Sequence, residues 1–267
     1  MNKAFKILVL MVVVNWFFGC EEETQWNLDT AEPIIIVDAI FTNEFKAHEV
    51  KIYSSHPNLN GTPEPITGAT VKGGLSNIVY TFFESEEEPG TYFSPPFAIA
   101  FDQTYKLEIE YQGKKSEAFA SGAYISELKK DTIYQNEEGL YKYVYTGSNT
   151  PAMTEVYYNW SHDANYCETY GSCYAAETFY TLNVIDIGQE FAPEKQSIYF
   201  PSGTTLTRRK YSLSDDHQEF IRSLLIETEW RGGLFDVEYG NVPTNFTNGV
   251  RGWFGICMVL EDTRVID

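Results

Sequence analysis

The stretch Tyr105-Lys106-Leu107-Glu108-Ile109-Glu110-Tyr111 alternates apolar and charged side chains without a break. Successive side chains on a β-strand point to opposite faces, so this pattern predicts a strand with one face buried and one face in water. Gln112-Gly113 follows as a two-residue turn, and residues 114–120 return as a second strand. The stretch therefore predicts a β-hairpin and points to a mainly β fold.

Similar runs rich in β-branched and aromatic residues lie on both sides of this hairpin and favour further strands. They are residues 34–37, 50–53, 69–71, 78–83, 141–145, 155–160, 178–185 and 204–211. We expect residues 33–123 to form a seven-stranded, immunoglobulin-like or transthyretin-like β-sandwich. Residues 124–267 are expected to form a second β-rich domain with one amphipathic helix.

That helix is predicted near residues 214–229. Ser212 or Ser214 can cap its first turn, where Asp215 and Asp216 favour the positive end of the helix dipole. Its apolar stripe is made of Phe220, Ile221, Leu224 and Leu225. Because His217 lies in the first turn, we expect its ring to be solvated.

Composition and charge exclude several classes of protein. The chain has 267 residues, 43% of them hydrophobic, which is enough to bury a core and excludes global disorder. Its 38 acidic and 19 basic side chains give a net charge of −19. A surface that binds nucleic acid or anionic lipid needs clustered Lys and Arg, so the charge argues against both partners.

The N-terminus is typical of an export signal. Lys3 and Lys6 precede an apolar run at 7–18, which is too short to span a membrane and is typical of a signal-peptide core. Phe17-Phe18-Gly19-Cys20 resembles a bacterial lipobox, in which the cysteine is acylated and becomes the new N-terminus. We expect residues 1–19 to be the signal peptide and Cys20 to carry lipid; an ordinary secretory signal is the alternative.

Residues 20–32 are polar and acidic and are predicted to be a lipid-anchored tether. Glu21-Glu22-Glu23 resembles the surface-export signal of Bacteroidota lipoproteins, although a charge run is also what a solvated linker contains. We therefore expect an outer-membrane, lipid-anchored protein that is exposed on the cell surface. Thr30 and Thr132 each follow an aspartate and precede an apolar residue, which resembles the O-glycosylation pattern of the same bacteria.

The three remaining cysteines are Cys167, Cys173 and Cys257. Cys167 and Cys173 are six positions apart, and an exported chain meets oxidising conditions, so a local disulfide is favoured. Free thiols and a metal site are the alternatives, and the latter lacks further ligands at familiar spacing. Cys257 lies in an apolar run and is predicted to be a core residue.

The sequence offers little evidence of catalysis. Ser161-His162-Asp163 are adjacent, but a triad is defined by convergence in space. The histidines are dispersed, and neither a nucleotide-binding loop nor a metalloprotease motif is present. We expect no enzymatic activity, no metal and no cofactor, and keep a hydrolase as the least favoured alternative.

Aromatic residues are better candidates for binding. Tyrosine and tryptophan present flat apolar faces with a polar edge, which suit sugars, peptides or a protein partner. Tyr166, Tyr170 and Tyr174 surround the cysteine loop in a polar stretch and are the candidate binding residues. Trp160, Trp230 and Trp253 are better explained by core packing.

Several segments in order resemble the domain of unknown function 4249 family of Bacteroidota outer-membrane lipoproteins. They are the lipobox with its glutamates, residues 65–71, 89–92 and 105–107, the capped helix, and residues 243–255. The resemblance covers nearly the whole mature chain. It implies a non-catalytic accessory or ligand-binding partner of a TonB-dependent receptor. A structural or adhesive envelope lipoprotein is the alternative.

Overall fold

The computed structural model describes residues 33–56, 61–130, 132–184, 196–230, 240 and 242–267. The predicted signal peptide and tether, with Cys20 and Thr30, lie outside these residues. The described part is mainly β, with sixteen strands and two helices, which confirms the predicted fold class. Neither of these two helices is long and apolar enough to cross a membrane.

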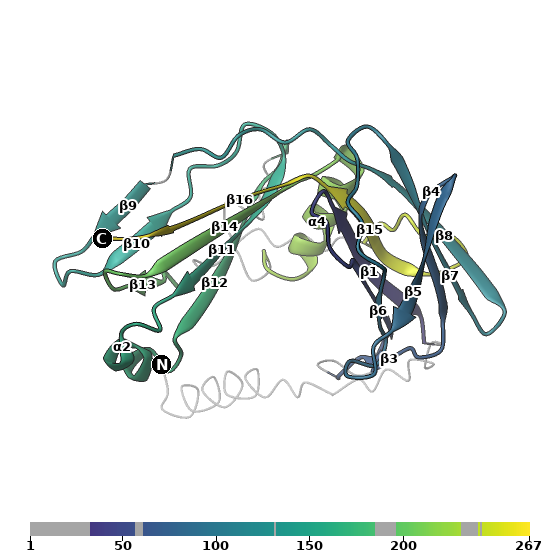
Figure 1. Ribbon diagram of the computed structural model, residues 1–267, viewed down its shortest axis with the longest axis horizontal. Helices are drawn as coiled ribbons and strands as arrows, with labels where there is room; N and C mark the ends of the chain where they lie inside the picture. Colours follow the sequence, from purple (N-terminus) through teal and green to yellow (C-terminus); the bar gives the residue numbers. More distant parts are fainter. Residues whose placement is uncertain (1–32, 57–60, 131, 185–195, 231–239, 241) are drawn as a thin grey trace, which may run out of the picture. The chain divides into compact units, whose positions relative to one another are not determined.

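The largest sheet has nine strands, in the order β15-β1-β2-β6-β5-β4-β7-β8, with β3 paired to β2 (Figure 1). The strands are β1 (Ile35–Thr42), β2 (Glu49–Ser54), β3 (Glu64–Pro65), β4 (Thr70–Leu75), β5 (Ile78–Glu84), β6 (Thr91–Phe93), β7 (Thr104–Tyr111), β8 (Lys114–Ser121) and β15 (Arg251–Cys257). The alternation at 105–111 appears as predicted in β7, where Tyr105, Leu107 and Ile109 are buried and the charged residues between them are not.

The last strand of this sheet comes from the far end of the sequence. β15 pairs in parallel with β1, with Trp253 opposite Asp38 and Phe254 opposite Ala39. Residues 251–257 were expected in a second domain, and the structure instead makes them part of the first sheet. A division at residue 123 therefore does not separate the sheets, and residues 33–267 form one unit.

Residues 245–248 join β15 to β8. The side chain of Asn245 accepts a hydrogen bond from the backbone N–H of Phe254 at 3.0 Å and donates to its carbonyl at 2.8 Å and to that of Phe119 at 3.3 Å. Thr247 contacts β8 through three hydrogen bonds. Its N–H donates to the carbonyl of Glu117 at 3.0 Å, its hydroxyl accepts from the N–H of Glu117 at 3.0 Å, and its carbonyl accepts from the hydroxyl of Ser116 at 2.7 Å. This connection brings the two ends of the sheet together around a core that includes Phe41 and Phe254.

The remaining strands form two smaller sheets. The four-stranded sheet has the order β12-β11-β14-β16, and the three-stranded sheet has the order β13-β10-β9. Their bounds are β9 (Thr132–Gln135), β10 (Tyr141–Val144), β11 (Ala152–Asn159), β12 (Tyr174–Thr181), β13 (Tyr199–Phe200), β14 (Thr205–Ser212) and β16 (Val259–Val265). Only Met258 separates β15 from β16, so one nearly continuous segment belongs to both the largest and the four-stranded sheet (Figure 1).

The helix α4 (Asp215–Glu227) begins as predicted, with Ser214 accepting a hydrogen bond from the N–H of His217. The expectation of a solvated His217 was wrong. Its ring is 3% exposed because position 217 lies one turn before Ile221, on the face of the helix that packs against β15. There it stacks on Trp253, with 5.7 Å between ring centres.

Candidate functional site

Strand alternation gives β1 an outward face, turned away from the core, on which Asp38 lies between two isoleucines. Val37, Ala39 and Phe41 are at most 2% exposed, so Asp38 and Ile40 project from the opposite face. The same alternation operates in the four-stranded sheet. In β11 and β14 it directs residues 153, 155, 209 and 211 to one face, where Met153 lies opposite Tyr211.

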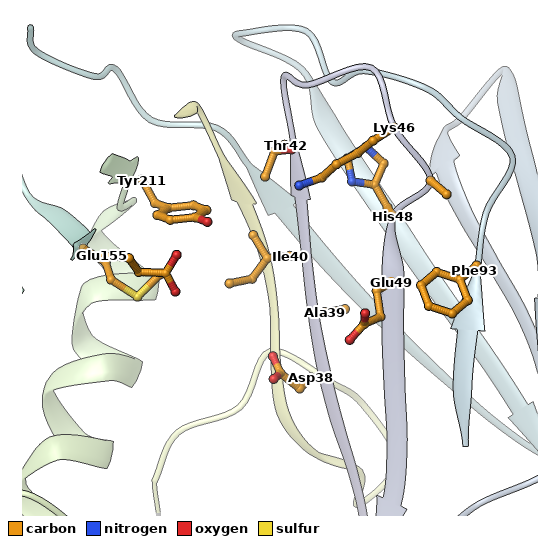
Figure 2. A pocket seen from close by; sticks show the side chains of 12 residues that line it. Asp38, Ala39, Ile40, Thr42, Lys46, His48, Glu49, Phe93, Glu155 and Tyr211 are labelled. Carbon is orange, nitrogen blue, oxygen red and sulfur yellow. The ribbon is translucent and has the colours of Figure 1, made fainter. Parts of the chain in front are cut away.

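These two faces line an open groove of about 340 Å³ (Figure 2). Figure 2 shows Glu155 and Tyr211 on one side and Asp38, Ile40 and Glu49 on the other. The lining residues are Asp38, Ala39, Ile40, Thr42, Lys46, Ala47, His48, Glu49, Phe93, Met153, Glu155 and Tyr211. Its volume lies at the lower end of the range that small-molecule sites occupy.

Three carboxylates face this groove. Among the described residues, Asp38 has neither a hydrogen-bond nor an ion-pair partner, whereas Glu49 pairs with Lys51 at 2.7 Å. Desolvation raises the pKa of Asp38, the positive charge of Lys51 opposes that effect, and Glu49 adds to it. Glu155 accepts a hydrogen bond from the hydroxyl of Tyr157 at 2.9 Å. Desolvation, and after it this carboxylate, raises the pKa of Tyr157 to about 12, so the hydroxyl stays protonated.

An ion-pair network lies beside the groove and contacts two of its lining residues, Lys46 and Tyr211. Arg209 donates to both oxygens of Glu44 and, at 2.6 Å, to Glu261. Burial alone would raise the pKa of Glu44, but the hydrogen bonds from Lys46 and Arg209 outweigh it and lower that pKa. Arg209 also donates to the hydroxyl of Tyr211 at 2.9 Å, which fixes this ring at the rim of the groove. Lys46 and Tyr211 are therefore each held by a partner within this network.

This arrangement suits binding through charge and shape. Unengaged carboxylate oxygens beside Ile40 and Met153 offer acceptors for a cationic or hydrogen-bonding group and an apolar surface for its carbon chain. Within the described ranges, no group of three or more His, Cys, Asp or Glu side chains is arranged to hold a metal ion. Two other lining residues already have partners: Lys46 donates to Glu44, and the hydroxyl of Tyr211 accepts from Arg209.

The adjacent Ser161, His162 and Asp163 do not converge into a triad. The Nε2 atom of His162 lies 2.8 Å from the carbonyl of Ser202. The carboxylate of Asp163 instead accepts from the N–H of Tyr166 and caps a second helix, α2 (Ala164–Tyr170). The stretch around the cysteines, expected to be a loop, thus contains a short helix, for which the capping Asp163 and Gly171 at the other end are the sequence signals.

Cys167 and Cys173 are joined by a disulfide that brackets the end of α2. The indole N–H of buried Trp160 donates to the carbonyl of Ser172 at 2.8 Å. The rings of Tyr166 and Tyr170 contact this indole edge-on, at 5.4 and 4.8 Å between centres. These two tyrosines therefore support the disulfide loop.

Tyr174 is the most exposed of the three candidate binding tyrosines, at 60%. None of the three lines the groove of Figure 2. Trp160, Trp230 and Trp253 are buried, as core packing requires, and so is Cys257. Thr132 begins β9 and is half-buried.

The sequence did not predict the groove residues. The alternation along β1 indicates that Asp38 points away from the core, but it does not indicate which strand faces Asp38. That neighbour comes from β11 and β14, more than 100 residues later.

The comparisons with known proteins give a family and no activity. A family model described as a domain of unknown function (DUF4249) matches residues 21–263. The chain belongs to this family. No curated protein matches this DUF4249 chain. A solved structure described as a cytokine receptor complex, crystal form 2, is 10% identical and is matched over 66% of this chain and 90% of its own, with a TM-score of 0.25. A score this low supports no argument about this DUF4249 protein.

Proposed function

We propose that the protein is a non-catalytic, outer-membrane lipoprotein, anchored through Cys20 and exposed on the cell surface. In this role it serves as an accessory or ligand-binding partner of a TonB-dependent receptor. The lipobox-like residues 17–20 and the glutamates that follow them support the anchor and its placement. Membership of the DUF4249 family supports the receptor context through the resemblance described above.

The groove supports a binding role in particular. Its Asp38 carboxylate has no partner among the described residues, although Lys51 lies near enough to influence its pKa. A solvent-accessible carboxylate without a partner beside an apolar surface favours a basic side chain of a partner protein. We therefore propose that a basic segment of the receptor occupies the groove.

The anchor is tested by membrane partitioning of Cys20→Ala. We expect the wild-type protein to remain with the membrane fraction and the variant to be released from it. A matched Cys257→Ala variant should partition like the wild type, because Cys257 is a buried core residue. A Cys20→Ala protein that stays in the membrane fraction would overturn the lipid anchor.

The receptor partnership is tested by isolating TonB-dependent receptors in a gentle detergent from cells that make this protein. We expect the lipoprotein to accompany it at a fixed ratio. A lipoprotein that always separates as a lone monomer would favour the structural or adhesive alternative instead.

A further inference from the structure

A second depression lies on the outer face of β5, β4, β7 and β8. Unlike the groove, it involves neither β11 nor β14. Val79, Gly74, Lys106 and Phe119 are direct cross-strand neighbours in one row across these four strands. Residues directly opposite each other share a face of the sheet, so the row lacks one side chain at Gly74. The gap separates Val79 from Lys106 by two strand spacings, or about 10 Å between their backbones.

Glycine is required at position 74 by the backbone itself. Its φ angle is 147°, and a Cβ there would collide with the carbonyl oxygen of Ile78. The missing side chain leaves a depression of about 590 Å³ on the sheet. It is lined by Lys72, Gly73, Gly74, Leu75, Ser76, Val79, Lys106, Glu108 and Phe119. We call this depression the glycine slot.

The walls of the glycine slot are apolar and solvent-exposed. Val79 is 60% and Phe119 is 57% exposed, although strand residues of this kind are usually covered. The ammonium of Lys106 lies 6.0 Å from the centre of the Phe119 ring and holds that side of the slot in place. Two exposed apolar walls on either side of a gap favour a ligand with a narrow apolar body.

The charges around the slot are unequal. Lys106 and Lys115 each contact both Glu108 and Glu117, at distances from 2.6 to 3.2 Å, so these four charges neutralise one another. Lys72 lies opposite Glu108 in the sheet, yet among the described residues its ammonium has no hydrogen-bond or ion-pair partner. The slot therefore has one surplus positive charge on a protein whose net charge is −19.

We propose that the glycine slot binds a small amphipathic anion, such as an aliphatic carboxylate. Its apolar body lies over Gly73 and Gly74 between Val79 and Phe119, and its anionic group meets the ammonium of Lys72. The positive charge of Lys72 favours an anionic ligand. The gap left by the missing side chain at Gly74 admits an aliphatic chain about as wide as one side chain. This binding is independent of the proposed receptor partnership, because the slot shares no residue with the groove.

The test is calorimetric titration of the purified protein with sodium octanoate and with 1-octanol as the uncharged probe. We expect saturable octanoate binding that Lys72→Gln weakens about fivefold, which corresponds to the loss of one solvent-exposed charge contact. Octanol binding should not change in this variant. The matched control is Lys114→Gln, since Lys114 is an exposed lysine at the start of β8 and does not line the slot.

A second pair of variants separates binding from folding. Phe119→Ser should weaken the binding of both probes. Phe83→Ser, which removes a phenylalanine that is 66% exposed and lies outside the slot, should weaken the binding of neither. If Phe119→Ser does not fold, Val79→Ser removes the opposite wall and is expected to act in the same way. The proposal is overturned if the wild type shows no saturable octanoate binding, or if Lys72→Gln and Lys114→Gln bind octanoate equally well.

Discussion

Arg209 donates hydrogen bonds to both carboxylate oxygens of Glu44, at 2.8 and 2.7 Å, although the two residues are 165 positions apart. Glu44 belongs to the turn after β1, and Arg209 lies in β14. The pair thus connects the largest sheet to the four-stranded sheet at the rim of the groove. Both side chains are partly buried, at 21% and 30% exposed, so water screens the interaction less than on an open surface.

Glu44→Gln should lower the free energy of unfolding by about 1 kcal/mol, because it removes a charge-assisted contact from Arg209 and from Lys46. Urea unfolding measures the change. The control is Glu219→Gln in the exposed pair with Arg222 on α4, which should cost less than about 0.5 kcal/mol. Equal effects of the two substitutions would contradict a special role for Glu44.

His217 should make the protein less stable in acid. Burial lowers its pKa from 6.5 to about 4, so the unfolded chain binds this proton first as the pH falls. The stabilising contribution is complete above pH 6.5 and is lost between about pH 6.5 and pH 4, with a total of roughly 3 kcal/mol. Unfolding measured across this interval should show the loss.

His217→Phe should reduce that dependence on pH, because it removes the buried imidazole. His48, whose pKa burial also lowers to about 4, continues to contribute in this variant, so the dependence should shrink without vanishing. An identical pH profile for His217→Phe and the wild type would show that His217 does not titrate in this way.

Asn245→Ala should destabilise the protein by about 2 kcal/mol. The substitution leaves the N–H and carbonyl of the fully buried Phe254 without their side-chain partner and frees the connection between β15 and β8. Thermal unfolding gives the magnitude. Asn77→Ala, in the exposed turn between β4 and β5, is the matched control and should change stability by less than about 0.5 kcal/mol. A shift no larger than that of the control would refute the role assigned to Asn245.

The sequence predicted the local structure well where one periodicity was clear. The alternation at 105–111 became β7, and the cap at Ser214 began α4. The burial of Cys257 also followed from its apolar neighbours. These predictions depend only on residues a few positions apart, so a single sequence contains the necessary information.

Long-range pairing could not be predicted in the same way. Nothing near Arg251–Cys257 indicates a parallel partner more than 200 residues earlier, and nothing near Asp38 identifies Glu155 across the groove. The depression at Gly74 likewise depends on which strands are neighbours. The burial of His217 was within reach, since its spacing from Ile221 and Leu225 places all three on one helical face.

The groove is tested most directly by receptor co-purification with a charge-reversed lining. Asp38→Lys combined with Glu155→Lys reverses two of the three groove carboxylates. Glu137→Lys, at an exposed turn between β9 and β10, makes the same kind of change elsewhere. We expect the double variant to fold, remain in the membrane fraction and lose the receptor, and Glu137→Lys to retain it. A folded double variant that still accompanies the receptor at the wild-type ratio would contradict the account.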